Sequence, residues 1–147
     1  MQECMKIYDE FFVTFPKPPK EIFEFYMNAC FTYGQLLVRD NRFEKAAEAY
    51  EKVLPSLKGE AWLNLAVETA EIYIRLAESL DDLSKRKKFL QSAEAIVNKL
   101  LWRTDKPVIF GRAVSMKAHI AQLGGDIERA NKTIEEHIGD LESIHAQ

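Results

Sequence analysis

The chain of 147 residues is long enough to bury the core of one ordinary domain. Apolar residues make up 47% and charged residues 29%, a balance typical of a folded, soluble protein. The net charge of −3, with both signs interspersed, excludes the basic surface of a typical nucleic-acid-binding protein. No apolar run approaches the roughly 18 residues that a membrane span needs. We therefore expect neither nucleic acid nor membrane among its partners.

The N-terminal sequence and the cysteines indicate the compartment. Glu3 interrupts the first residues with an early negative charge, which a secretory signal peptide does not tolerate. Cys4 and Cys30 are the only cysteines, so no second pair completes a zinc site, and reduced, buried thiols are expected. The sequence therefore predicts a cytoplasmic protein, and the basic run at 85–88 adds nuclear import as an alternative.

Apolar residues recur at spacings of three and four throughout the chain, which predicts an all-α fold. Seven helices are expected. Six lie at about 2–14, 19–39, 42–54, 60–79, 107–123 and 126–145, and the fifth in chain order carries Phe89, Ala93, Ile96, Val97, Leu100 and Leu101. Pro16, Pro18 and Pro19 end the first helix, and Pro19 can also open the second at its first turn. Asp40-Asn41 supply a turn and a cap, Asp81 or Asp82 caps the fifth helix, and Gly124-Gly125 form the last turn. Connections this short imply antiparallel neighbours.

Each predicted helix carries an apolar stripe. The first aligns Cys4, Tyr8, Phe11 and Phe15, the fourth aligns Trp62, Leu65, Ala66, Thr69, Ile72, Tyr73 and Leu76, and the last aligns Ile127, Ala130, Ile134, Ile138, Leu141 and Ile144. Stripes of this kind usually face a core.

Two segments share a spacing of small and large residues across a short polar turn. The first has Gly34, Ala46 and Tyr50, and the second has Ala118, Ala130 and Ile134. In each, the two small residues lie twelve positions apart and the bulky residue follows one helical turn later. Small residues let two antiparallel helices approach closely where they cross, so this spacing predicts a helical hairpin.

The residues around these hairpins resemble the tetratricopeptide repeat family, whose unit is a helix–turn–helix of about 34 residues. The segment FEKAAEAYEKVLP at 43–55 is similar to the second helix of that repeat, and WLNLA at 62–66 is similar to its first helix. Cys4, Tyr8 and Pro16 fit a second helix without its partner. The resemblance covers about 1–145. It implies one domain, 1–147, built as a short right-handed solenoid, and a fragment of a longer protein is left open as an alternative. The helix at 1–16 would be unpaired, and hairpins would follow at 19–55, 60–103 and 107–146.

The middle hairpin departs from the family period. Gly34 and Ala66 are 32 residues apart, whereas Ala66 and Ala118 are 52 apart. The middle hairpin therefore carries about sixteen extra residues, which are expected to lengthen both of its helices.

The resemblance also implies a function and a site. Proteins of this family bind partner segments in a concave groove lined by the first helix of each repeat, and they need no cofactor. Carried over to this chain, the groove residues are Asn28, Phe31, Gln35 and Val38, then Leu63, Asn64, Val67 and Glu71, then Arg112, Ser115, His119 and Gln122. The set lacks the full group of cations that one branch uses to clamp a peptide carboxylate. We expect an adaptor that docks an amphipathic helix or extended peptide of another protein by apolar contacts with a few polar anchors.

No catalytic or metal-binding motif is present, so the sequence predicts a non-enzymatic protein without a metal or cofactor. The closest histidines, His137 and His145, are eight residues apart on one helix, which separates them by roughly 12 Å along the axis. Gly124-Gly125 follows a helix rather than the strand that a nucleotide-binding loop requires.

Other interpretations stay open. The long helices could fill the groove internally, or an enzymatic or ligand-sensing site could lie between the long middle helices. The aromatic N-terminal helix, with Phe11, Phe12, Val13 and Phe15, could mediate self-association in an oligomerisation or regulatory domain of a larger protein. Lys85-Arg86-Lys87-Lys88 could bind an acidic partner or serve in nuclear import, or it could be the solvated face of a helix start.

Overall fold

The computed structural model describes residues 2–14 and 19–145, apart from the side chains of Cys4, Phe12 and 139–145. These residues form seven α-helices and one short 3-10 helix, with no strand among them. The helices are α1 (Gln2–Thr14), α2 (Lys20–Arg39), α3 (Phe43–Val53), η1 (Leu54–Ser56), α4 (Gly59–Glu78), α5 (Leu83–Arg103), α6 (Pro107–Leu123) and α7 (Ile127–His145). The expected all-α class with seven helices is confirmed for this part of the chain.

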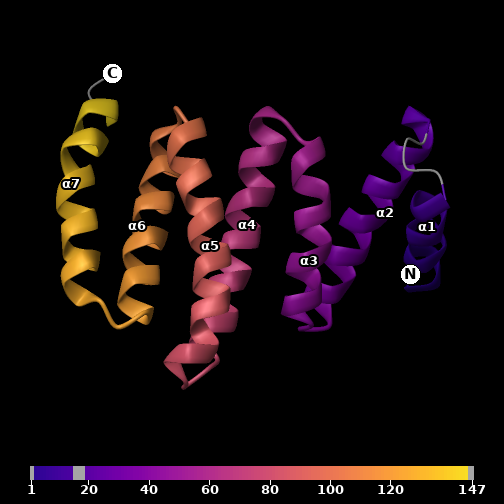
Figure 1. The fold of residues 1–147 in the computed structure, drawn as a ribbon. Coiled ribbons are helices and arrows are strands. Elements are labelled where there is room, and N and C mark those ends of the chain that lie inside the picture. The colour runs from indigo at the N-terminus through magenta and orange to yellow at the C-terminus, as the bar shows by residue number, and fades with distance from the viewer. Residues whose placement is uncertain (1, 15–18, 146–147) are drawn as a thin grey trace. The chain divides into compact units, whose positions relative to one another are not determined.

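The helices belong to two compact units, Met1–Leu57 and Lys58–Gln147. Unit 1 contains α1, α2, α3 and η1, and unit 2 contains α4 to α7. Within the units, α2 packs on α3, α4 on α5, and α6 on α7, each pair joined by a short turn (Figure 1). The repeated spacing of small and large residues predicted the hairpins of α2 with α3 and of α6 with α7, and the resemblance implied the middle one.

The turns follow the predicted punctuation with two corrections. Asp82 caps α5 as expected, because its carboxylate accepts a hydrogen bond from the backbone N–H of Ser84 at 2.8 Å. The predicted turn at Asp40-Asn41 is present, and Asp40 is the C-cap of α2, but neither residue is the N-cap of α3. Asn41 takes a left-handed conformation with φ 59° to close the turn, and Arg42 occupies that N-cap. Pro19 occupies the N-cap of α2 and not its first turn, while Pro16 and Pro18 lie outside the described residues.

Unit 1 is built around the close approach of α2 and α3 that the sequence predicted. Gly34 lies against the ring of Tyr50, and a Cβ added to Gly34 would stand 2.5 Å from Tyr50 Cε1 and 2.7 Å from Cδ1. Tyr50 is only 1% exposed, and Ala46, the other small residue of the pattern, is fully buried. The hairpin therefore depends on the absence of a side chain at Gly34.

Unit 2 has its core around α4, whose predicted stripe is buried except for the half-buried Leu76. Ala118, Ala121 and Ala130 form the buried contact of α6 with α7, as the second copy of the pattern predicted. The extra residues of the middle hairpin are divided between both helices. The helix α4 continues twelve residues past Ala66, whereas α2 continues only five past Gly34, and α5 has 21 residues against 11 in α3. The α4–α5 turn accordingly extends beyond the α6–α7 turn of the same unit (Figure 1).

The first and last helices depart from their predicted stripes. In α1 the buried residue is Met5, while Tyr8 and Phe11 are half-buried; the Cys4 side chain and Phe15 lie outside the described part. In α7, Ala130 is buried, but Ile127, Ile134 and Ile138 are 66%, 44% and 45% exposed. No described helix covers the outer side of this stripe, which is why these three isoleucines stay exposed. The side chains of Leu141 and Ile144 are outside the described part.

Candidate functional site

The residues predicted to line a groove divide into two sets, one in each unit. Asn28, Phe31 and Gln35 lie at spacings of three and four on one face of α2 in unit 1, and all three are exposed. Phe31 packs its ring against Tyr50 at a centroid distance of 5.9 Å. Val38, the fourth predicted residue of α2, is half-buried. The other eight residues are in α4 and α6 of unit 2.

In unit 2, two ion pairs and one contact between a carboxylate and a histidine join α4 to α6. Glu60 pairs with Lys106 at 3.0 Å, Glu71 pairs with Arg112, and Glu78 pairs with His119 Nε2 at 2.9 Å. The acids are spaced along one stripe of α4 and their partners follow in the same order on α6, so the two helices run parallel. Glu71 and Arg112 were both predicted to contact a bound partner protein, but in the structure they form an ion pair with each other. Pairs this exposed contribute little to stability, about 0–1 kcal/mol each, but they fix the register of the two helices.

Two predicted residues of α4 have opposite environments. Val67 is 5% exposed and lies on the same stripe as Glu60, Glu71 and Glu78, the stripe that faces α6. Asn64, one turn earlier, is exposed. Val67 is therefore a packing residue between α4 and α6, whereas Asn64 is free to meet a partner.

Ser115 and His119 line a hollow between α6 and α7 with a volume of about 410 Å³. Ala118 and Gln122 complete its α6 wall, and its α7 wall consists of Ile127, Ala130, Asn131 and Ile134. In the first hairpin the equivalent bulky residue, Tyr50, is buried against Gly34. Here Ile134 is 44% exposed, because Ala118 and Ala130 already close the helix contact beneath it.

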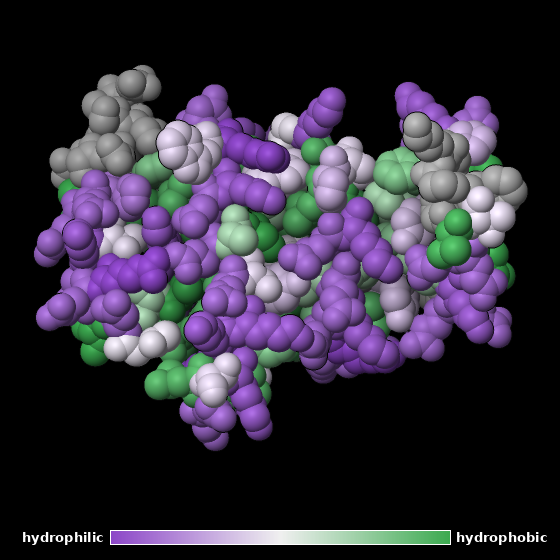
Figure 2. Space-filling view, in the orientation of Figure 1, coloured by the Kyte–Doolittle hydropathy of each residue, from purple (hydrophilic) through white to green (hydrophobic). Residues whose placement is uncertain are grey.

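Exposed aliphatic side chains extend this hollow along the hairpin. Val108 is 73% exposed and lies seven residues before Ser115, on the same side of α6, while Ile138 lies four residues after Ile134 on α7. Figure 2 shows hydrophobic surface emerging near the start of α7 among hydrophilic side chains. We call this surface the α6–α7 face and define it by Val108, Ser115, His119, Gln122, Ile127, Asn131, Ile134 and Ile138. Contiguous exposed apolar surface rimmed by polar groups is typical of interaction sites.

The α7 half of this face was missed as a site by sequence reasoning, which assigned its isoleucines to the stripe of the last helix. A signal was available in the polar residues of α6. When Ala118 of α6 is aligned with Ala66 of α4, the two helices can be compared position by position. Ser115, His119 and Gln122 of α6 then correspond to Leu63, Val67 and Ala70 of α4. The α4 residues are buried and the α6 residues are partly or fully exposed. The change from apolar to polar residues indicates that this side of α6 is exposed to solvent, whereas the corresponding side of α4 is buried.

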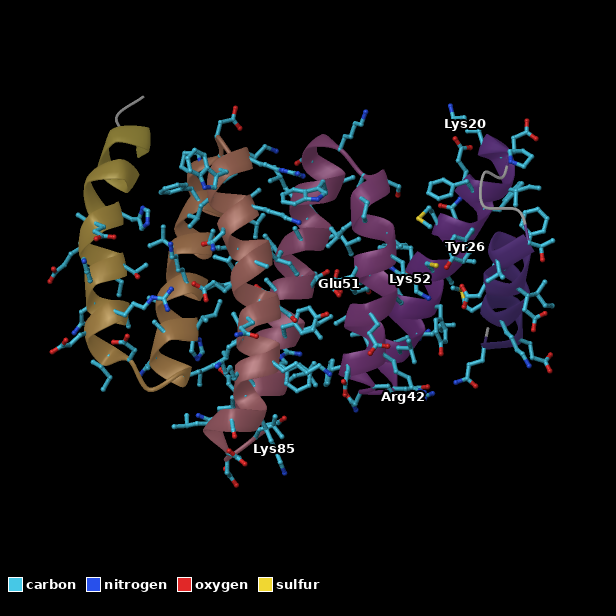
Figure 3. The ribbon with its side chains drawn as sticks, viewed as in Figure 1. Lys20, Tyr26, Arg42, Glu51, Lys52 and Lys85 are labelled. Atoms are coloured by element: carbon cyan, nitrogen blue, oxygen red, sulfur yellow. The ribbon has the colours of Figure 1, made fainter. Side chains whose placement is uncertain are left out.

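In unit 1, a polar cluster ties α1 to α2 and α3. The Tyr26 hydroxyl donates a hydrogen bond to Asp9 Oδ1 at 2.8 Å, and Lys52 Nζ lies 3.9 Å from the same oxygen. Tyr26 and Lys52 approach each other from α2 and α3 (Figure 3). Burial, together with the hydrogen bond to Asp9, raises the pKa of Tyr26 above its usual range. Burial likewise raises the pKa of the Cys30 thiol, which is free and fully buried as predicted.

The Tyr26 phenol should resist ionisation for as long as unit 1 is folded. Because its folded-state pKa is raised, the protonated phenol contributes stability below the ordinary tyrosine pKa of about 10, and this contribution is lost as the pH rises further. We expect the difference in tyrosinate absorbance between the wild type and Tyr26→Phe to develop only well above pH 10, together with loss of helical circular dichroism. A difference that titrates with a midpoint near pH 10 in the folded chain would contradict the buried hydrogen bond.

The basic run at the start of α5 is partly structural. Arg86 donates hydrogen bonds from Nε to the Leu80 carbonyl and from Nη1 to the Leu123 carbonyl, the latter at 3.3 Å. It therefore holds carbonyl groups at the C-terminal ends of α4 and α6. Lys85, Lys87 and Lys88 are exposed, and Lys85 lies at the outer end of the α4–α5 hairpin (Figure 3).

The remaining chemistry-bearing residues form no cluster. His119 pairs with Glu78, and His137 packs edge-on against Phe110 at 6.0 Å, while the His145 side chain lies outside the described part. Among the described residues, no three histidine, cysteine, aspartate or glutamate side chains are grouped to hold a metal ion. The helices described here include none with the length and apolarity required to cross a membrane.

Comparisons with protein-family models, with curated proteins and with solved structures found no match to this chain.

Proposed function

We propose that the chain is a non-enzymatic adaptor of the cytoplasm, built from tetratricopeptide-like hairpins, that binds a helical or extended segment of another protein. The observation that carries this proposal is the α6–α7 face. Three of the predicted groove residues, Ser115, His119 and Gln122, line its hollow together with the exposed Ile127 and Ile134. Two further exposed aliphatic side chains, Val108 and Ile138, continue it along the hairpin. A row of apolar side chains at helical spacing, with a few polar groups beside it, suits the docking of an amphipathic helix.

The other predicted residues have supporting roles in this proposal. Glu71 and Arg112 hold α4 and α6 in register, and Val67 packs between them. Asn64, which is exposed, would extend the contact surface along α4. Because the framework of unit 2 is held by buried apolar residues, the face can bind a partner without a large rearrangement.

Affinity capture with matched variants tests the proposal. Ile134→Glu places a charge in the hollow at a half-exposed position, so the fold should persist while recovery of the partner falls at least about tenfold. Gln91→Glu introduces the same group at an exposed position of α5 that is not part of the α6–α7 face, and it should leave recovery unchanged. Equal recovery with all three baits would contradict a binding role for the α6–α7 face.

A double variant tests the α4 side. Asn64→Ala combined with Arg112→Ala removes one exposed amide and one member of an exposed ion pair, at a cost of about 1 kcal/mol or less. Unchanged recovery would remove these two residues from the binding surface without affecting the role of Ile134.

Self-association through unit 1 is a second candidate function. Ile7 and Val13 of α1 are 66% and 85% exposed, and Phe25 of α2 is 64% exposed. The predicted Phe15 lies outside the described residues, as does the Phe12 side chain. Sedimentation velocity over a range of concentrations tests it, and a chain that stays monomeric throughout would contradict self-association.

A further inference from the structure

We propose that the segment bound by the α6–α7 face is a basic amphipathic helix, an inference that rests on the proposed function and names the class of partner. Ile127, Ile134 and Ile138 form an apolar row on α7 about 16 Å long, equivalent to three turns of a helix. A partner helix lying along the hairpin would place apolar side chains at a spacing of three and four against this row and in the 410 Å³ hollow.

The charges beside the row select the partner. Glu128 follows Ile127 and Glu135 follows Ile134 in the sequence. Both glutamates are exposed and lie on the same side of α7, beside the row of isoleucines. Neither carboxylate has an ion-pair partner among the described residues. The two described cations of α7 are already engaged, Arg129 with Glu94 at 2.6 Å and Lys132 with Glu136 at 3.8 Å. The α7 rim of the face therefore offers negative charge, which lysine or arginine on a bound helix would complement. On the α6 side, Arg112 lies on the stripe of Val108 and Ser115, but it is already paired with Glu71.

The same charges disfavour a second copy of this chain as the occupant. On α1, the exposed Ile7 lies in one row with Glu3 and Glu10, so this helix would bring acids against Glu128 and Glu135. Two α6–α7 faces packed on each other would likewise place the same two glutamates against themselves. Like charges brought together at an interface oppose association.

A binding assay with designed peptides tests the inference directly. The probe is a fluorescently labelled helical peptide of about 14 residues with leucines along one face and lysines on both sides of that face. The control peptide has glutamate in place of every lysine. We expect fluorescence anisotropy at low salt to show binding of the lysine peptide and at least about tenfold weaker binding of the glutamate peptide.

Variants of the full chain locate the effect. Ile134→Glu should abolish binding of both peptides, and Glu128→Lys combined with Glu135→Lys should reverse the preference between them. Glu21→Lys combined with Glu51→Lys makes the same change in net charge within unit 1 and should leave the preference intact. Circular dichroism of each variant verifies that its helices persist.

The outcomes separate this inference from the proposed function. Equal binding of both peptides that is lost in Ile134→Glu overturns the basic preference and leaves the α6–α7 face as a binding site. Binding of neither peptide, while affinity capture still depends on Ile134, overturns the basic helix as the occupant. Binding of neither peptide, together with capture that ignores Ile134, overturns both proposals. A preference for lysine that Glu128→Lys with Glu135→Lys reverses supports the inference.

Discussion

Val67→Asp is expected to unfold unit 2 or bring it close to unfolding, with a loss of about 3–5 kcal/mol in the free energy of unfolding. Val67 is 5% exposed at the contact of α4 with α6, so an aspartate there would be buried with no cation of its own. Glu60 and Glu71 lie on the same stripe of α4 and would add repulsion. The loss is a large fraction of the 5–15 kcal/mol typical of a whole domain.

The matched control is Asn64→Asp, which introduces the same carboxylate one turn earlier at an exposed position. Its effect should stay within about 0.5 kcal/mol. Urea denaturation followed by tryptophan emission measures both variants, because both tryptophans are in unit 2 and Trp62 is buried. If both aspartates were tolerated equally, Val67 would be an open groove residue and the assignment to the α4–α6 contact would be wrong.

Gly34→Ala is expected to destabilise unit 1 by about 1–2 kcal/mol, although alanine is the better helix former. Helix propensity favours alanine by about 1 kcal/mol. The added Cβ, however, would stand 2.5 Å from the ring of Tyr50, which is 1% exposed and has no space to move into. Overpacking of this kind typically costs about 1–3 kcal/mol. A contact as close as 2.5 Å places the cost in the upper part of that range, so it should exceed the gain in helix propensity.

Labelling of Cys30 measures the effect in unit 1 alone. Cys30 is fully buried and its thiol pKa is raised, so a Cys4→Ser background should react with iodoacetamide only when unit 1 opens. A loss of 1–2 kcal/mol corresponds to labelling that is about 5 to 30 times faster. In a Tyr50→Leu background the same alanine should cost less, because the smaller side chain makes room for the Cβ. Equal costs in both backgrounds would contradict the Gly34–Tyr50 contact as the cause.

The helices and their hairpins could be predicted because their determinants are local. Gly124-Gly125, Asp82 and the spacing from Gly34 to Tyr50 each specify a turn, a cap or a contact within one hairpin. Neither Asp40 nor Asn41 is the N-cap of α3, because Asn41 takes a left-handed turn conformation instead. Asparagine favours both conformations, so the residue type alone does not distinguish them.

The site was predicted less well because it depends on which surfaces are covered. Periodicity shows that Ile127, Ile134 and Ile138 share one stripe, but the same pattern arises whether the stripe faces a core or a partner. Val67 was placed in a groove by resemblance, and only the packing of α6 on α4 makes it a core residue. The pairing of Glu71 with Arg112 depends on the register of two helices that are separated along the chain by α5.

Site-specific photo-cross-linking from the α6–α7 face tests the central claim most directly. Asn131 lies in the hollow beside Ile134 and is exposed, so a photoreactive amino acid at this position would face a bound partner. The same amino acid at Gln91, exposed on α5, is the matched control. The account predicts a cross-linked partner protein from position 131, none from position 91, and loss of the cross-link on adding Ile134→Glu. Equal cross-linking from both positions, or a product that persists with Ile134→Glu, would contradict it.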